Sequence, residues 1–445
     1  MRIKLLSILA LFAISIGQSQ EQSNSYSLDE AIAFALENNY SAKNANLDIV
    51  DARKQKWETI ATGLPQISGA ISYQNQLKQP ISLIPAEFFG GEPGTFQPIT
   101  FGQPQQASAT ATLKQQIFDG SYIVGVQATK TFLDYSANNK EKTDLEVRKA
   151  IVEAYGNVLL AQESVLILTK NLATLEKNLF ETQKIYENGL GDEESVEQLQ
   201  ITTSSVKSQL SNAERLEGIT LQMLNLIMGI AIDSPTQLSE NLDDLTMKQI
   251  DLGLIDTPFS MENNVDYKLA NNLNEQRALE LKLAKSMALP TLNAFVNYGS
   301  TAYSDSFDFL GGSPEWFNSS ILGLDLNIPI FSSMKRSAST QRAKIAVEKA
   351  KTQLSEAKEQ IRLQLERAKS DYILSIEQYE TAKQNLGLSE RIEQKNQVKY
   401  FEGIASSFEL RQAQTQLYTT QQEYLQSMVM VINRKTELEI ILNNN

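Results

Sequence analysis

The sequence offers few side chains that could carry out chemistry. Its 445 residues include no histidine and no cysteine, so the commonest general base, the thiol nucleophile and the usual zinc ligands are missing. It also lacks a glycine-rich phosphate loop of the kind that nucleotide-binding enzymes use. The sequence therefore predicts that the protein is not an enzyme and that it binds neither a cofactor nor a catalytic metal.

The charge balance narrows the choice of partner. The chain has 53 acidic residues against 40 lysines and arginines, a formal net charge of −13 and a pI near 4.8. Binding to nucleic acid requires a basic surface that neutralises phosphates. Nucleic acid is therefore excluded as the main partner.

Two short segments share the pattern Tyr-x-x-Gly, at residues 186–189 and 400–403. Each follows a long stretch in which apolar residues step by three and four, which is typical of a helix packed against neighbours. A glycine after such a stretch is a natural place for a helix to end and the chain to reverse. We therefore predict that each segment is the tip of a long helical hairpin.

The two tips belong to an internal duplication. Tyr400 follows Tyr186 by 214 residues, and the apolar stretches before the two tips have the same phase. Two further motifs occur twice, 225 residues apart: Asn38-Asn39 with Asn263-Asn264, and Leu64-Pro65 with Leu289-Pro290. A repeat of this length decides the fold class before any single element does.

The N-terminus reads as a secretory signal peptide, residues 1–19. Arg2 and Lys4 precede an apolar stretch at residues 5–16, and small residues follow at a possible cleavage site. The apolar stretch is too short to cross a membrane as a helix. We therefore expect an exported bacterial-type protein.

Each repeat reads as helix, strand, loop, strand, long helix, tip and returning helix. An acidic linker, residues 230–262, separates the first repeat (20–229) from the second (263–445). Alternating apolar and polar residues predict strands at about 66–76, 107–118, 291–299 and 321–331. Residues 79–106 hold five of the 11 prolines and are predicted to be loop.

Four strands per chain impose a constraint if they enter a membrane. A barrel of at least eight strands is needed, because an open sheet edge in lipid leaves backbone groups without hydrogen bonds. Chains must then share one barrel, and three chains would supply twelve strands. The fold class we predict is mainly helical with β: duplicated coiled-coil hairpins and four strands per chain.

The order of these motifs, repeated twice, resembles the TolC family of outer-membrane efflux proteins over essentially the whole mature chain. The resemblance implies a homotrimer with a 12-stranded barrel in outer-membrane lipid and a helical tunnel in the periplasm. It further implies an exit duct that passively conducts substrates delivered by an inner-membrane pump through a periplasmic adaptor protein. The channel would open when the tip helices untwist.

The same resemblance implies site residues at the tips. Glu409 matches a position that forms a ring of acids at the narrowest point of the pore, and Gln412 stands where a second acid can occur. Tyr400 can bond to an aspartate of the first hairpin, at the position that Ser195 fills here. The Tyr186, Gly189, Tyr400 and Gly403 positions are expected at the gate and at the surface where the adaptor docks.

Alternative interpretations stay open at this point. A periplasmic adaptor also has a long helical hairpin, but it should carry one hairpin and compact β-domains, whereas this chain carries two hairpins and separate strands. Glu409 could simply lie on a solvated helix face. The loop with Phe88, Phe89, Phe96 and Phe101 could bind a ligand or pack on neighbouring loops at the outer mouth.

Overall fold

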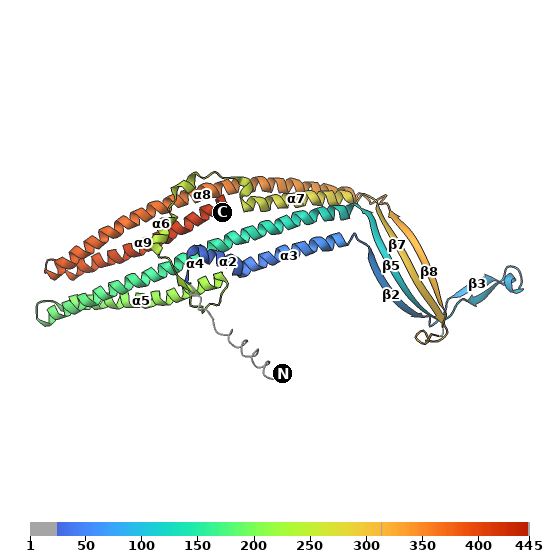
Figure 1. Ribbon diagram of the computed structural model, residues 1–445, viewed down its shortest axis with the longest axis horizontal. Helices are drawn as coiled ribbons and strands as arrows, with labels where there is room; N and C mark the ends of the chain where they lie inside the picture. The colour runs from blue at the N-terminus through green and yellow to red at the C-terminus, as the bar shows by residue number, and fades with distance from the viewer. Residues whose placement is uncertain (1–24, 313, 444–445) are drawn as a thin grey trace, which may run out of the picture. The chain divides into compact units, whose positions relative to one another are not determined.

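The computed structural model describes residues 25–312 and 314–443 (Figure 1). The predicted signal peptide, residues 1–19, lies outside the described residues. The chain divides into two compact units. The helical unit contains the chain up to Asp48, Ser136–Ala270 and the chain from Ser355 onward, and the sheet unit contains Ile49–Tyr135 and Asn271–Leu354.

Long helices dominate the described chain. Helices α4 and α5 form one hairpin and α8 and α9 form the other, as the ribbons in Figure 1 show. Their turns contain Gly189 and Gly403, at φ 75° and 72°, a left-handed conformation that glycine adopts without a steric penalty. The helices are α2 (Leu28–Asn38), α3 (Tyr40–Ala61), α4 (Gly120–Glu187), α5 (Glu193–Met228), α6 (Leu242–Gln249), α7 (Val265–Ser286), α8 (Lys335–Phe401) and α9 (Ser407–Leu442).

The core of the helical unit contains residues from both hairpins. Ile151 and Tyr155 of α4, Tyr372 of α8 and Ile432 of α9 are all fully buried in one apolar cluster. Among the described helices, α4 is also long and apolar enough to pass as a membrane span, with a mean hydropathy of 1.3 over 18 residues. Of that window, 44% is buried inside the protein.

The duplicated asparagines join helix ends in the helical unit. The side-chain amide of Asn39 donates to the carbonyl oxygen of Ile227, near the end of α5, at 2.6 Å, and its oxygen accepts from the Ser41 backbone N–H. In the second repeat, Asn264 donates to the carbonyl oxygen of Ile441 at 3.1 Å, and its oxygen accepts from the Asp266 N–H. Each asparagine thus caps the start of one helix and the end of another.

The sheet unit is built on one antiparallel sheet with strand order β2-β5-β7-β8. Its strands are β2 (Gln66–Asn75), β5 (Gln105–Asp119), β7 (Thr291–Ser304) and β8 (Trp316–Asn327). The pairing of β5 with β7 joins the two repeats, and β2 and β8 form the two edges. Strand β8 begins and ends earlier than predicted, because β7 extends far enough to pair with Trp316 and Pro329 cannot donate to a ladder.

One predicted loop is wrong. Within residues 79–106 the chain forms a two-stranded ribbon of β3 (Ile81–Pro85) and β4 (Phe96–Thr100), joined through a 3₁₀ turn at Ala86–Phe89. The prolines hid these strands, yet Pro85 and Pro98 are compatible with a ribbon in which each strand has a free edge. Two further short strands, β1 (Ser25–Tyr26) and β6 (Gln237–Leu238), pair in parallel in the helical unit.

Removing one asparagine cap should destabilise the helical unit. We expect Asn264→Ala to lower the free energy of unfolding by about 1–3 kcal/mol, because the buried Asn264 side chain satisfies a carbonyl oxygen and a backbone N–H. Thermal unfolding of the detergent-purified protein, followed by circular dichroism, measures the change. Asn263→Ala is the matched control, since Asn263 is exposed. Equal midpoints for the two variants would contradict the capping role.

Candidate functional site

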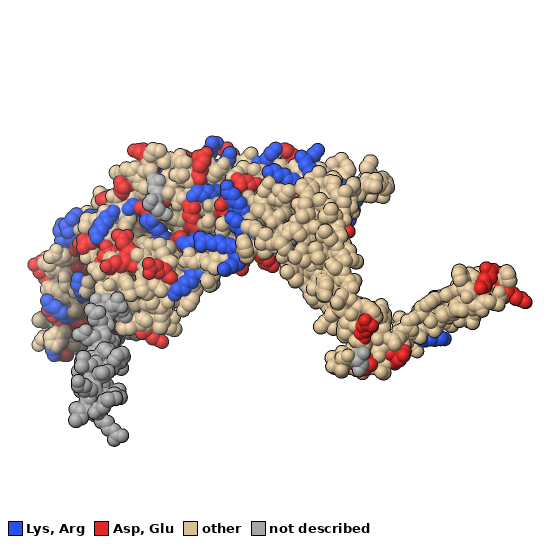
Figure 2. Space-filling view, turned by 45° about the vertical axis from the view of Figure 1, so that its right-hand side comes forward, with Lys and Arg blue, Asp and Glu red and all other residues tan. Residues whose placement is uncertain are grey.

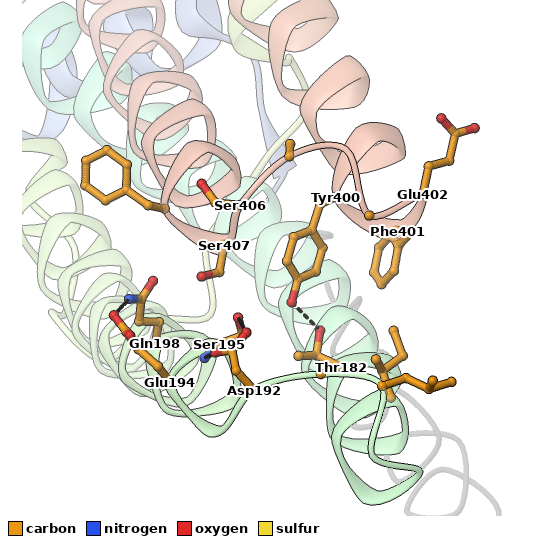
Figure 3. Close-up of a pocket in the computed structure, with 16 residues that line it drawn as sticks. Thr182, Asp192, Glu194, Ser195, Gln198, Tyr400, Phe401, Glu402, Ser406 and Ser407 are labelled. Carbon is orange, nitrogen blue, oxygen red and sulfur yellow. Dashed lines mark hydrogen bonds between the residues drawn. The ribbon is translucent and has the colours of Figure 1, made fainter.

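The tips of the two hairpins enclose a cavity of about 670 Å³. Its lining comes from both tips and includes Tyr400, Gly403 and Ser195, three of the residues singled out from the sequence. Figure 3 shows Tyr400 reaching from α8 toward α4, while Phe401 and Glu402 lie farther along the turn. Tyr186 and Gly189 lie in the first tip, where the Tyr186 carbonyl accepts from the Gly189 N–H at 2.8 Å.

Tyr400 bonds across the hairpins to a residue that the sequence analysis did not consider. Its hydroxyl lies 3.2 Å from the hydroxyl of Thr182 on α4 (Figure 3). Ser195, the expected partner, bonds instead to Asp192, the residue that caps α5. The Ser195 hydroxyl donates to the Asp192 carboxylate at 2.9 Å, and the Ser195 N–H donates to it at 2.7 Å. A side chain held by a local cap is not available to the other hairpin.

Glu409 is held at the start of α9. Its carboxylate accepts from the backbone N–H and the hydroxyl of Ser406, at 2.8 and 3.0 Å, in a capping box. These two hydrogen bonds lower the pKa of Glu409, so the exposed carboxylate stays charged under mildly acidic conditions. Gln412, one turn further along α9, is exposed. Within a single chain, Glu409 is part of the capping box at the start of α9. A ring of acids would require the Glu409 side chains of other copies.

A cluster of polar side chains lies between the hairpins, which we call the polar cluster: Asn178 on α4, Glu393 and Gln397 on α8, and Gln414 on α9. Gln397 donates to the side-chain oxygen of Asn178 at 3.0 Å. The amide of Gln414 faces the Glu393 carboxyl, yet neither of its polar atoms reaches hydrogen-bond geometry among the described residues. Burial raises the pKa of Glu393 because it disfavours the charged form.

The polar cluster weakens the contact between the hairpins near their tips. A buried polar atom left without a hydrogen bond costs about 1–3 kcal/mol. The side-chain nitrogen of Asn178, Nδ2, is also unpaired among the described residues. The apolar cluster around Tyr155 and Tyr372 is far larger, although Asn433, next to its Ile432, also has an unpaired side-chain oxygen among the described residues. The hairpins are therefore held together by a large apolar core around Tyr155 and Tyr372. Beside the polar cluster they share only a small apolar cluster around Leu175, against which Tyr418 of α9 packs.

The four-stranded sheet has two faces of opposite character. Strand residues alternate between faces, and the pairing of Ile71 with Ala109 and of Val296 with Leu322 places these side chains on one face. That face is exposed and apolar, with Leu322 at 77% and Ile71 at 88% exposure. Its larger members are Ile67, Ile71, Tyr73, Leu113, Phe118, Leu292, Val296, Tyr298, Trp316, Leu322, Leu324 and Leu326.

The opposite face of the sheet is mixed, because Phe295, Phe317 and Ile321 lie on it among polar and charged side chains. It carries Ser72 hydrogen-bonded to Ser108 at 2.8 Å and Thr112 hydrogen-bonded to Asn297. By the register, the charged residues of these strands, Lys114, Asp119 and Asp325, all fall on this face. Figure 2 shows that charged side chains crowd the helices and are sparse over the sheet. An uncharged apolar face, backed by a face that holds every charged residue of these four strands, suits contact with lipid on one side and water on the other.

Part of this site could have been found in the sequence. Asn178 and Thr182 continue the heptad stretch that includes Leu175, so a polar residue at a core position was the signal. The pairing of Tyr400 with Thr182 had no comparable signal, because it depends on the relative rotation of two helices that are far apart in sequence.

Comparison with known proteins places the chain among outer-membrane proteins. Residues 31–229 and 263–444 match the sequence profile of a family described as outer membrane efflux protein. The two matched segments leave out the whole acidic linker, residues 230–262. No match was found among curated proteins.

Several solved structures share the fold. The outer membrane protein VceC from Vibrio cholerae is 16% identical, with 93% of this chain and 95% of that chain covered and a TM-score of 0.70. The outer membrane channels CmeC from Campylobacter jejuni and MtrE from Neisseria gonorrhoeae, the latter in its open state, are each 17% identical over 93% of this chain. They are covered to 85% and 88%, with TM-scores of 0.71 and 0.70. The predicted fold class is confirmed.

The unpaired amide of Gln414 gives a direct test of the polar cluster. We expect Gln414→Leu to raise the free energy of unfolding by about 1–2 kcal/mol, because an apolar side chain of similar size removes an unsatisfied buried group. Gln416→Leu, on the exposed side of the same helix, is the control and should change stability little. Denaturant unfolding of the detergent-purified variants measures both values, and a destabilised Gln414→Leu would show that the amide is satisfied.

Proposed function

The chain belongs to the outer membrane efflux protein family, and from this premise we propose that it forms the exit duct of a tripartite export system. Members of this family are channels of the outer membrane and not enzymes. In our proposal three copies form one 12-stranded barrel in the outer membrane and a helical tunnel in the periplasm. Substrates would reach the duct from an inner-membrane pump through a periplasmic adaptor protein.

The observation that carries this proposal is the sheet with one uncharged apolar face and two unpaired edges. In lipid, the free N–H and C=O groups of β2 and β8 must find partners, and no strand of the same chain pairs with them on their outer sides within the described residues. Adjacent copies can supply them if β8 of one copy pairs with β2 of the next. Each repeat, 20–229 and 263–445, would then contribute two strands and one hairpin, with residues 230–262 as the acidic connection.

We assign the gate to the tips of the hairpins. The firm apolar core and the loose polar cluster favour motion in which the second hairpin separates from the first near Tyr400 while the rest stays packed. The Tyr400–Thr182 bond would hold the closed state, and Glu409 and Gln412 would face the constriction. The surfaces around Tyr186, Gly189 and Gly403 would receive the adaptor. The alternative, that this chain is itself the adaptor, is disfavoured by its two hairpins and its family.

Removing the hydroxyl of Tyr400 should favour the open channel. Tyr400→Phe loses one hydrogen bond to Thr182, worth about 1 kcal/mol, which shifts the closed-to-open equilibrium about fivefold for each copy. Single-channel recording in a planar bilayer would then show a higher open probability than the unmodified protein. Tyr186→Phe in the other tip is the matched control, and the same opening in both variants would contradict a latch at Tyr400.

Neutralising Glu409 should weaken block by cations. Glutamine can keep the capping box with Ser406, so Glu409→Gln removes the charge while the start of α9 stays folded. A trimer loses three charges. We therefore expect the concentration of a trivalent cation that blocks half of the current to rise about tenfold or more. Glu380→Gln, an exposed acid of α8, serves as the control. Unchanged block in Glu409→Gln would remove this residue from the pore.

A further inference from the structure

The ribbon of β3 and β4 is an ordered structure with almost no core of its own. Its turn is held by hydrogen bonds from the Ala86 N–H to the Thr95 carbonyl and from the Gly91 N–H to the Ala86 carbonyl, both 2.9 Å. The Glu87 carboxylate accepts from the Gly94 N–H at 3.2 Å. A two-stranded ribbon alone is only marginally stable in water. Such a defined turn therefore suggests that the ribbon packs against something.

One face of the ribbon is apolar and exposed. The pairing of Leu83 with Pro98 and of Pro85 with Phe96 places these residues together with Ile81 on that face, which we call the ribbon face. Its Ile81, Leu83 and Phe96 side chains are 61%, 66% and 62% exposed. The turn adds Phe88 and Phe89, at 79% and 59%. The opposite face carries the polar residues Ser82 and Gln97 together with Ile84 and Ile99, which are half-buried and so less exposed than the apolar side chains of the ribbon face.

The chemistry of the ribbon argues against lipid as the covering surface. Residues 76–104 include one basic residue, Lys78, and two acids, Glu87 and Glu92, so there is no basic cluster to bind anionic headgroups (Figure 2). The hydrocarbon layer is also excluded, because each strand of the ribbon has one edge with unpaired backbone groups. The phenylalanines have no polar end, which fits burial against an uncharged protein surface.

We infer that the ribbon face is covered by the same ribbon of neighbouring copies. This inference rests on the proposed function, because the shared barrel would bring three ribbons to one rim. The Gln76 N–H donates to the Pro104 carbonyl oxygen, and the side-chain amide of Gln79 donates to the Gly102 carbonyl oxygen. The ribbon therefore begins directly at the ends of β2 and β5. Identical uncharged faces held on one rim meet at a high effective concentration, whereas a separate partner would have to diffuse to them.

The dimensions allow this contact. Five residue pairs at about 3.4 Å each make the ribbon strands about 17 Å long. Twelve strands about 4.8 Å apart and tilted by about 40° enclose a circle of radius about 12 Å. A ribbon rooted on that circle can therefore reach the axis. Three ribbon faces packed together there would form an apolar cap over the outer mouth. The described residues between β7 and β8 of the second repeat form no such ribbon.

Because the chain has no cysteine, single cysteines can test the contact cleanly. Leu83→Cys places a thiol on the ribbon face, and Gln97→Cys places one on the opposite face, at a position that is also exposed. Cells carrying either variant are treated with a short bis-maleimide, and membranes are run on a denaturing gel. We expect Leu83→Cys to give a band at twice the chain mass, with up to two of every three copies cross-linked. Gln97→Cys should remain mostly at the mass of a single chain.

The outcomes separate this inference from the function on which it rests. A membrane-impermeant maleimide shows that both thiols react, and a native gel of the unmodified protein shows whether the trimer has formed. An intact trimer in which Leu83→Cys joins no better than Gln97→Cys would overturn the ribbon contact alone. A band that joins Leu83→Cys to another protein would also overturn it. A protein that stays monomeric in membranes would overturn the proposed function as well.

Discussion

The structure depends on the unpaired edges of one sheet. Among the described residues, no strand pairs with the outer sides of β2 and β8. In water alone, such free edges would favour uncontrolled association. An uncharged apolar face across all four strands makes water an unsuitable surrounding in any case. Both problems are solved at once if copies of the chain close a barrel in lipid. The duplication fits this solution, because two strands from each repeat meet through β5 and β7.

Within the helical unit, packing changes along the hairpins in a way that matches a gated duct. The apolar core around Tyr155 and Tyr372 and the asparagine caps at Asn39 and Asn264 fix the helices firmly. Toward the tips the apolar contact between the hairpins shrinks to a small cluster around Leu175 and Tyr418, and some buried polar groups beside it lack partners among the described residues. Regions with few satisfied contacts are the ones that open at low free-energy cost. We connect that difference in packing with the proposed position of the gate.

The sequence predicted the parts of this fold that local patterns determine. The glycines at 189 and 403 mark real turns, and the heptad stretches before them supply buried residues such as Ile151 and Ile361. Contacts between distant segments were not predictable in the same way. Ser195 was expected to meet Tyr400, but Ser195 bonds to the Asp192 cap and Tyr400 bonds to Thr182. The ribbon was missed because its prolines signal a loop, although a strand with a free edge accepts them. The role of Glu409 in a ring stays a prediction, since a ring needs neighbouring copies.

The mass of the purified assembly tests the central claim most directly. The protein would be extracted from outer membranes in mild detergent and weighed by native mass spectrometry after removal of the detergent. The account predicts a single species at three times the mass of the mature chain, because twelve strands close the barrel and satisfy every edge. A stable monomer, or an assembly whose copy number is not three, would contradict it.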